Sequence, residues 1–282
     1  SPLKQLENIV GLAEVKQFVR SLQAQLLLDE QRKKAGLPTL SSGSLHMVFS
    51  GNPGTGKTTV ARIIAALLAE LGLLTSGHLV EADRAALVAG YVGQTAIKVT
   101  NCVKEALGGI LFVDEAYTLV QGDKDSFGRE ALDTLMKLME DHRDELVVVF
   151  AGYSEEMEEL LKANPGLRSR FPTVITFANY SAPELMAICE GLLAAEQLAL
   201  SPAGTEVVQG ALEAVAAKAA TGDRRAANGR AVRNLIEQAK RQQALRLGEM
   251  AARGEQPTVA QLTEIADADV QFAARADWLG SS

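Results

Sequence analysis

Apolar residues in the first part of the chain gather in short runs, each followed by a longer stretch of mixed character. Three of these runs, 45–49, 109–113 and 146–151, have the length and the mostly apolar character of buried strands, and two short strands are expected at 78–81 and 174–177. Between and before them, apolar residues recur every three or four positions, which predicts helices over 12–34, 60–68, 95–107, 127–142 and 155–163. Strands that alternate with helices indicate an α/β fold with a parallel five-stranded sheet flanked by helices.

The pattern changes to alanine-rich helix near residue 178. Ser181, with Glu184 three residues later, is a helix-start signal, and helical patterns follow over 183–196, 203–219, 228–248 and, less regularly, 258–275. A short strand near Thr258-Val259 is the one strand signal in this part. The sequence therefore predicts a large α/β domain over 1–178 and a small all-helical domain over 179–282.

A phosphate-binding motif follows the first strand. Residues 51–58 read Gly-Asn-Pro-Gly-Thr-Gly-Lys-Thr and match the P-loop pattern G-x-x-x-x-G-K-[ST]. Its glycines let backbone N–H groups close around phosphates, Lys57 can reach the β- and γ-phosphates, and the Thr58 hydroxyl can ligate Mg²⁺. The following helix places its N-terminus at the phosphates. We expect ATP and Mg²⁺ as cofactors, with contacts from Asn52, Pro53, Gly54, Thr55, Gly56, Lys57, Thr58 and Thr59.

Two adjacent acids end the third apolar run. Residues 110–115 read Ile-Leu-Phe-Val-Asp-Glu, the form of a Walker B strand. Asp114 is expected to hold the Mg²⁺ together with Thr58, and Glu115 to act as base or orienter for an attacking water. Because no feature specific to another phosphate acceptor is visible, water is the expected nucleophile and ATP hydrolysis the expected reaction.

Composition and net charge indicate which binding partners and which cellular compartment to expect. The chain has 282 residues, a net charge of −7 and a pI of about 5.2, whereas a nucleic-acid-binding domain is usually basic. Cys102 and Cys189 are too few for a disulfide framework and lack metal spacing. Neither a membrane-spanning apolar run nor a signal peptide is visible. We expect a cytoplasmic protein without membrane insertion, and an organellar stroma or matrix remains open.

These motifs resemble those of the AAA+ ATPases, in which a P-loop α/β module precedes a small helical lid domain. The resemblance implies that Asn8, Ile9 and Gly11 contact the adenine. It implies that Arg170 reaches the nucleotide of a neighbouring subunit as an arginine finger, with Arg168 as the alternative finger. It also implies that Arg233, in the Asn-Gly-Arg-Ala-Val-Arg segment 228–233, senses the γ-phosphate of its own subunit. Lys57, Asp114, Glu115, Arg170 and Arg233 are thus the expected catalytic set.

Two further segments can be compared with this family: one departs from its usual pattern and the other resembles it. The usual Asn or Thr at the end of the fourth strand is missing from 149–154, so the residue in that sensor position stays open. Tyr91, Val92 and Gly93 resemble the aromatic–hydrophobic–glycine pore loop of AAA+ rings that thread proteins. An exposed aromatic ring offers a large grip that tolerates many sequences, and neighbouring glycines let the loop move.

Within AAA+, segments 108–117, 150–153 and 164–171 resemble the CbbX/CfxQ and stage V sporulation protein K group. This group includes red-type Rubisco activases and ATPases linked to sporulation and secretion. The activases typically carry His-Thr-Ala-Pro-Lys after the pore glycine, whereas residues 94–98 here read Gln-Thr-Ala-Ile-Lys. The resemblance implies a homo-oligomeric ring, usually a hexamer, that uses ATP to remodel a protein client. A nucleotide-dependent switch or scaffold is the alternative, and a nucleic-acid motor is the third hypothesis.

Overall fold

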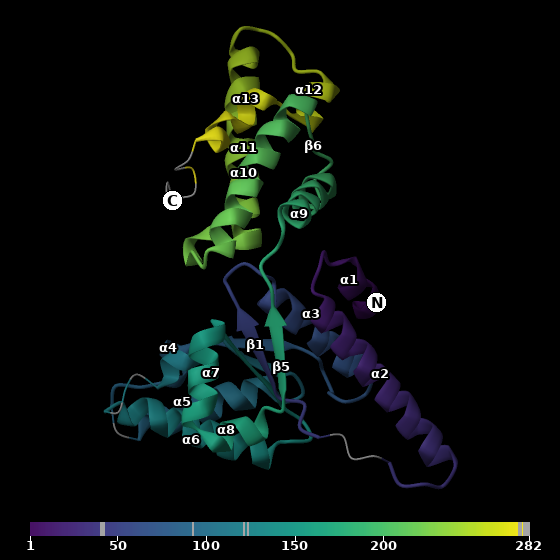
Figure 1. Ribbon diagram of the computed structural model, residues 1–282, viewed down its shortest axis with the longest axis vertical. Coiled ribbons are helices and arrows are strands. Elements are labelled where there is room, and N and C mark those ends of the chain that lie inside the picture. Colours follow the sequence, from purple (N-terminus) through teal and green to yellow (C-terminus); the bar gives the residue numbers. More distant parts are fainter. Residues whose placement is uncertain (40–42, 92, 121, 123, 276–277, 279–282) are drawn as a thin grey trace. The chain divides into compact units, whose positions relative to one another are not determined.

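A computed structural model describes residues 1–39, 43–91, 93–120, 122, 124–275 and 278. The chain divides into two compact units (Figure 1). Unit 1 contains Ser1–Gly51 and Gly56–Phe177, and unit 2 contains Asn52–Thr55 and Ala178–Ser282. Unit 2 is therefore discontinuous in sequence, because it includes four residues of the P-loop.

Unit 1 is built on one five-stranded sheet of parallel strands in the order β2-β3-β4-β1-β5. The strands are β1 Met47–Gly51, β2 Leu79–Ala82, β3 Ile110–Val113, β4 Val147–Gly152 and β5 Thr173–Phe177. Every residue of β1, β3 and β4 is buried, which is why these segments read as continuous apolar runs. The predicted parallel five-stranded α/β fold is confirmed.

Helices cover both faces of this sheet (Figure 1). Alternate strand residues point to opposite faces, so Val48 belongs to one apolar core and Phe49 to the other. Helices α5–α8 pack over the first core and α1–α3 over the second. The helices of unit 1 are α1 Pro2–Asn8, α2 Ala13–Lys34, α3 Lys57–Glu70, α4 Arg84–Leu87, α5 Gln94–Ala106, η1 Ala116–Leu119, α6 Ser126–Asp141, α7 Ser154–Ala163 and α8 Pro165–Arg170.

Unit 2 is mainly helical. Its elements are α9 Ala182–Ala195, β6 Ala199–Leu200, α10 Pro202–Ala220, η2 Arg224–Ala226, α11 Asn228–Ala252, α12 Val259–Thr263, β7 Glu264–Ile265, α13 Asp267–Val270 and η3 Gln271–Ala274. Ser181 and Glu184 form the expected capping box. The strand predicted near Thr258 is wrong, because Thr258 and Gln261 form a second capping box that starts α12. In the described part of the chain, no helix combines the length and the apolar character needed to cross a membrane.

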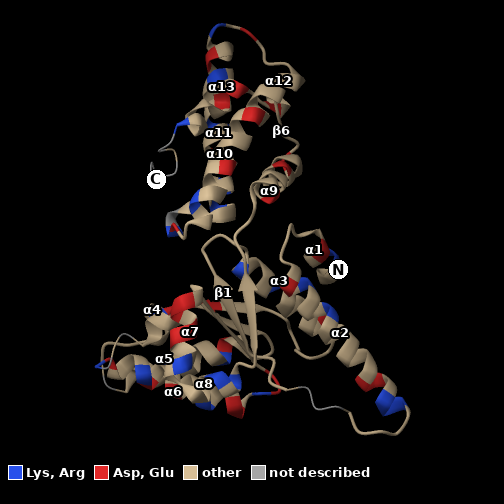
Figure 2. Ribbon diagram, viewed as in Figure 1, with Lys and Arg blue, Asp and Glu red and all other residues tan. Residues whose placement is uncertain are grey.

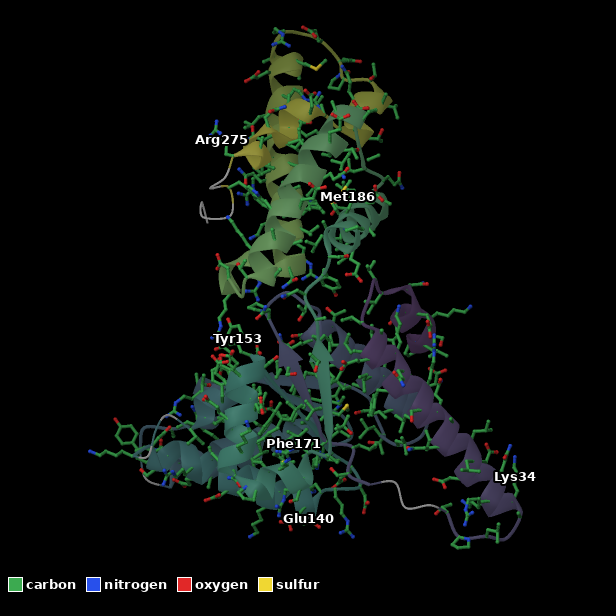
Figure 3. The ribbon with its side chains drawn as sticks, viewed as in Figure 1. Lys34, Glu140, Tyr153, Phe171, Met186 and Arg275 are labelled. Atoms are coloured by element: carbon green, nitrogen blue, oxygen red, sulfur yellow. The ribbon has the colours of Figure 1, made fainter. Side chains whose placement is uncertain are left out.

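His46 is buried just before β1, and its ring centre lies 5.8 Å from that of Phe171. Figure 3 labels Phe171. Its Nδ1 accepts a hydrogen bond of 2.9 Å from the backbone N–H of Val148. Burial lowers the pKa of His46 from 6.5 to about 4, with Glu140 opposing this shift and the positive charge of Arg170 supporting it. The imidazole is thus held neutral in the folded protein.

Acidification is therefore expected to destabilise the fold through His46. As the pH falls from 6.5 towards 4, His46 is protonated in the unfolded chain but stays neutral in the folded protein. The free energy of unfolding therefore drops by roughly 3 kcal/mol. Urea unfolding of the wild type and of His46→Asn across this pH range measures how much His46 contributes to the pH dependence of the free energy of unfolding. The wild type should lose more stability than His46→Asn. Parallel pH profiles for wild type and His46→Asn would contradict the prediction.

Candidate active site

Three of the expected catalytic residues of unit 1 follow strands of the sheet. Lys57 comes after β1 and the pair Asp114-Glu115 after β3, and β4 lies between these two strands. Because all strands are parallel, their carboxyl ends share one edge of the sheet, and this edge is where open α/β sheets bind ligands. The fold thus brings the Walker B acids and the start of the P-loop helix to the same edge.

The second half of the P-loop leads directly into helix α3. Gly56 has a φ of 95°, a left-handed conformation that favours glycine, and α3 begins at the next residue. The Lys57 Nζ donates a hydrogen bond of 2.8 Å to the Gly51 carbonyl, so its side chain folds back along the loop. Thr58 is half-buried and Thr59 is exposed. The N–H groups at the start of a helix, together with the adjacent ammonium group, suit phosphate oxygens.

The first half of the P-loop, Asn52–Thr55, belongs to unit 2 and is held there by its backbone carbonyl groups and by the Asn52 side chain. The Tyr180 hydroxyl donates a hydrogen bond of 3.0 Å to the Thr55 carbonyl. The Asn228 Nδ2 donates one of 3.3 Å to the Pro53 carbonyl. Two further bonds join the Gly229 N–H to the Gly54 carbonyl at 2.9 Å, and Asn52 Nδ2 to Asn179 Oδ1 at 2.9 Å.

Asn179, Tyr180 and Asn228 are residues that the sequence-based prediction missed. Asn228 is buried and has a φ of 43°, and its side-chain oxygen accepts a hydrogen bond from the Tyr180 N–H. Asn228 stands at the start of the 228–233 segment, and this position was the sequence feature that could have pointed to it. Gly54 is needed for close approach, because a Cβ there would collide with the Ala227 carbonyl.

Asp114 and Glu115 are both exposed at the end of β3. The Asp114 N–H extends the sheet by bonding to the Ala82 carbonyl at 2.9 Å, and Asp114 Oδ1 accepts a hydrogen bond from the Glu115 N–H at 3.0 Å. Glu115 has a φ of 47°, and η1 starts directly after it. A left-handed backbone costs a residue with a Cβ about 1–2 kcal/mol, so the surrounding structure must hold Glu115 in place.

The donor set suits Mg²⁺ bound together with phosphates. Thr58 offers a hydroxyl and Asp114 a carboxylate, both of them hard oxygen ligands. No group of three or more His, Cys, Asp or Glu that could hold a metal occurs among the described residues. Magnesium commonly takes one or two protein oxygens and fills its remaining positions with phosphate and water, so two protein ligands are sufficient.

Arg168 and Arg170, the alternative fingers, lie on the short helix α8. Figure 2 shows that α8 is basic while the preceding α7 carries mainly acidic residues. Arg168 is exposed, whereas Arg170 is half-buried and its Nη1 donates a hydrogen bond of 3.2 Å to the Gly166 carbonyl. The Arg170 Nε is buried without a hydrogen-bond partner in the described structure.

The other expected contacts lie near the N-terminus and on α11. Asn8 is exposed at the end of α1, Ile9 is half-buried, and Gly11 has a φ of 69°. In unit 2, Arg233 is exposed on α11, and its charge opposes the rise that burial causes in the pKa of Tyr180. Arg230, one turn earlier on α11, is also exposed and was not singled out from the sequence.

The segment between α4 and α5 presents Tyr91 to solvent. The Tyr91 side chain is 73% exposed, and Gly93 forms the N-cap of α5 with a φ of 79°. The base of the segment is fixed, because the buried Thr95 hydroxyl accepts a hydrogen bond of 3.1 Å from the Ala89 N–H. Val92, the third expected residue of this loop, lies outside the described residues.

Comparison with known proteins identifies the family. The family model for the ATPase family associated with various cellular activities (AAA) matches residues 47–179, and that for the AAA lid domain matches residues 181–277. Stage V sporulation protein K of Bacillus subtilis is 45% identical over 244 residues, which cover 86% of this chain and 75% of that protein. The chain belongs to the AAA ATPase family.

Other relatives place this AAA ATPase in the group that the motifs indicated. The chloroplastic ribulose bisphosphate carboxylase/oxygenase activase of Cyanidioschyzon merolae is 40% identical over 245 residues, covering 85% of this chain and 80% of that protein. The ESX-1 secretion system protein EccA1 of Mycobacterium tuberculosis is 42% identical over 252 residues, covering 87% of this chain but 44% of EccA1. An AAA domain followed by a lid domain is therefore confirmed, and membership implies ATP binding and hydrolysis.

Proposed function

We propose that this AAA ATPase assembles into a ring, most simply a hexamer, and uses Mg²⁺-dependent ATP hydrolysis to remodel a protein client through a central pore. A finger that acts on a neighbour's nucleotide requires a head-to-tail interface, and such an interface generates a closed ring when the rotation between subunits closes. The names of the relatives, which include a Rubisco activase and proteins of sporulation and secretion, support a protein as the client.

In this proposal the residues divide the hydrolytic step between them. Glu115 accepts a proton from the water that attacks the γ-phosphorus, while the bond to the β–γ bridging oxygen breaks to give ADP and phosphate. Lys57 neutralises phosphate charge, and Thr58 and Asp114 would hold Mg²⁺, which would stabilise the negative charge of the phosphate oxygens. Arg170 acts from the neighbouring subunit and Arg233 from the same chain. Asn8, Ile9 and Gly11 contact the adenine.

The exposure of Tyr91 is the observation that carries the remodelling part of the proposal. A tyrosine that is 73% exposed contributes nothing to a core, and a Cβ placed at either flanking glycine, Gly90 or Gly93, would meet no atom within 4 Å. An aromatic ring on open backbone can contact many peptide sequences. The acidic net charge gives a nucleic-acid motor no comparable support.

Tyr91→Ala is expected to abolish client remodelling while the assembled oligomer still hydrolyses ATP. In the proposal, the Tyr91 side chain contacts the client and not the nucleotide. The client is first retained on the Glu115→Gln protein in ATP and identified by mass spectrometry. ATP hydrolysis with and without that client is then measured for the wild type, Tyr91→Ala, Tyr91→Phe and Val259→Ala. Val259 is a matched control, since it is an exposed apolar residue of unit 2.

The expected result is client stimulation that disappears in Tyr91→Ala and persists in Tyr91→Phe and Val259→Ala. Undiminished remodelling by an assembled Tyr91→Ala ring would rule out threading. Stable, nucleotide-dependent client binding with a low rate that the client does not change would instead favour the switch or scaffold.

A further inference from the structure

Arg84, the first residue of α4, makes four hydrogen bonds inside unit 1. Its Nη1 donates to the carbonyls of Thr118 and Leu119 at 2.8 and 2.9 Å and to Asp125 Oδ2 at 2.6 Å. Its Nη2 donates to Asp125 Oδ1 at 3.1 Å. The two side chains are only 28% and 9% exposed. A bidentate pair with this burial is geometrically well defined, unlike the mobile ion pairs of an open surface.

Asp125 has a second task that fixes it in place. It is the N-cap of α6, and its Oδ1 accepts a hydrogen bond of 2.9 Å from the Gly128 N–H. Gly128 is buried, and a Cβ there would collide with the Leu119 carbonyl and with this carboxylate. Arg84 therefore joins the N-cap of α6 to the end of η1.

The helix η1 is the turn that begins immediately after Glu115. The Glu115 carbonyl accepts two hydrogen bonds from Thr118, one from its N–H at 2.8 Å and one from its hydroxyl at 2.7 Å. The Thr118 carbonyl in turn accepts from Arg84. An unbroken series of hydrogen bonds therefore runs from the backbone of Glu115 through Thr118 and Arg84 to Asp125.

Glu115 needs such support because its backbone is left-handed. A residue in that conformation persists only where its surroundings over-determine it. Glu115, Arg84 and Thr118 also line one open hollow of about 510 Å³. A shift of η1 would therefore move the carboxylate that the proposed hydrolysis requires, although Arg84 itself needs no contact with ATP.

We propose that Arg84, anchored by Asp125, is the positioning residue for Glu115: it holds η1 so that the Glu115 carboxylate faces the attacking water. This inference rests on the proposed hydrolytic role of Glu115. It predicts a loss in the rate of the chemical step, whereas a purely structural pair would contribute to stability alone. The experiment must separate these two effects.

Unit 2 contains a matched control, the pair Arg246–Asp269. Its side chains are 28% and 1% exposed, and it is also bidentate, with Nε–Oδ1 at 2.8 Å and Nη2–Oδ2 at 2.7 Å. Asp269 also accepts a hydrogen bond from a backbone N–H near the start of a helix, that of Ala266 at 2.9 Å. The two pairs thus share chemistry and burial, and only the Arg84 pair connects to Glu115.

Arg84→Gln and Arg246→Gln are compared with the wild type for kcat, for the Kd of a fluorescent ATP analogue and for Tm. Arg84→Gln should lower kcat by about 10- to 100-fold, the effect of a misplaced catalytic group, with nucleotide Kd within about twofold of the wild type. Arg246→Gln should lower the Tm about as much as Arg84→Gln does, but its kcat should stay within about twofold of the wild-type value. Arg84→Lys should only partly rescue kcat, because lysine cannot reproduce the bidentate fork.

Asp125→Asn is a second test of the pair. The asparagine keeps an oxygen that can accept the hydrogen bond from the Gly128 N–H, but it removes the negative charge that faces Arg84. It should lower kcat in the same direction, and its effect should not add to that of Arg84→Gln in the double variant. Equal kcat losses at both pairs, an unchanged kcat in Arg84→Gln, or additive losses in the double variant would overturn the inference. Absence of hydrolysis in the assembled wild type would instead overturn the proposed function itself.

Discussion

Replacing Arg170 by alanine is expected to lower ATP hydrolysis by about 10³- to 10⁵-fold while each subunit still binds ATP. The reason is that an arginine finger stabilises charge that develops only in the transition state, on the nucleotide of the neighbouring subunit. Phosphate release at saturating ATP measures the loss, and a fluorescent ATP analogue measures binding. Arg168→Ala is the matched control, because Arg168 lies on the same helix and is exposed.

Mixed rings test whether Arg170 acts between subunits. A Lys57→Ala subunit loses its own nucleotide site but still carries Arg170, and an Arg170→Ala subunit carries an intact site without a finger. Mixing the two inactive proteins should restore part of the hydrolysis. No restoration would contradict a finger that acts in trans, and a loss confined to Arg168→Ala would transfer the role to Arg168.

Glu115→Gln is expected to lower kcat by about 10²- to 10⁴-fold, the usual contribution of a general base, with little change in ATP affinity. Glutamine keeps the size of the side chain but cannot accept the proton from water. The measurement pairs single-turnover hydrolysis with nucleotide binding, so that chemistry is separated from affinity.

Two controls make the Glu115 result specific. Glu81→Gln changes an exposed acid on the adjacent strand β2 and should leave hydrolysis unchanged. Lys57→Ala should lose nucleotide binding, which shows what a defect in affinity looks like in the same assay. Turnover near the wild-type value in Glu115→Gln would remove Glu115 from the proposed mechanism.

Local signals in the sequence were sufficient for most elements of unit 1. The buried strands were visible because β1, β3 and β4 are covered on both faces and therefore contain almost no polar residue. The strand order was not predicted. Any order in which helices connect parallel strands preserves the same alternation, so the position of β4 between β1 and β3 emerges only from the structure.

The site shows the same division between local and long-range information. Lys57 and Glu115 were predictable because the P-loop and Walker B patterns are continuous in sequence. Arg84 was not, because its partner Asp125 is 41 positions away and neither residue belongs to a motif. The weak helical segment expected over 258–275 is not continuous. It consists of α12, α13 and η3 and is interrupted by β7, whose residues Glu264 and Ile265 pair with the equally short β6.

The discontinuity of unit 2 has a consequence for engineering chimeras of this family. A swap that exchanges only residues 178–282 for those of a relative would leave Asn52–Thr55 behind, although these residues are part of the exchanged unit. Tyr180, Asn228 and Gly229 of the donor would then have to match carbonyl positions set by a foreign loop. The transferable cassette is therefore the C-terminal segment together with four residues more than a hundred positions upstream.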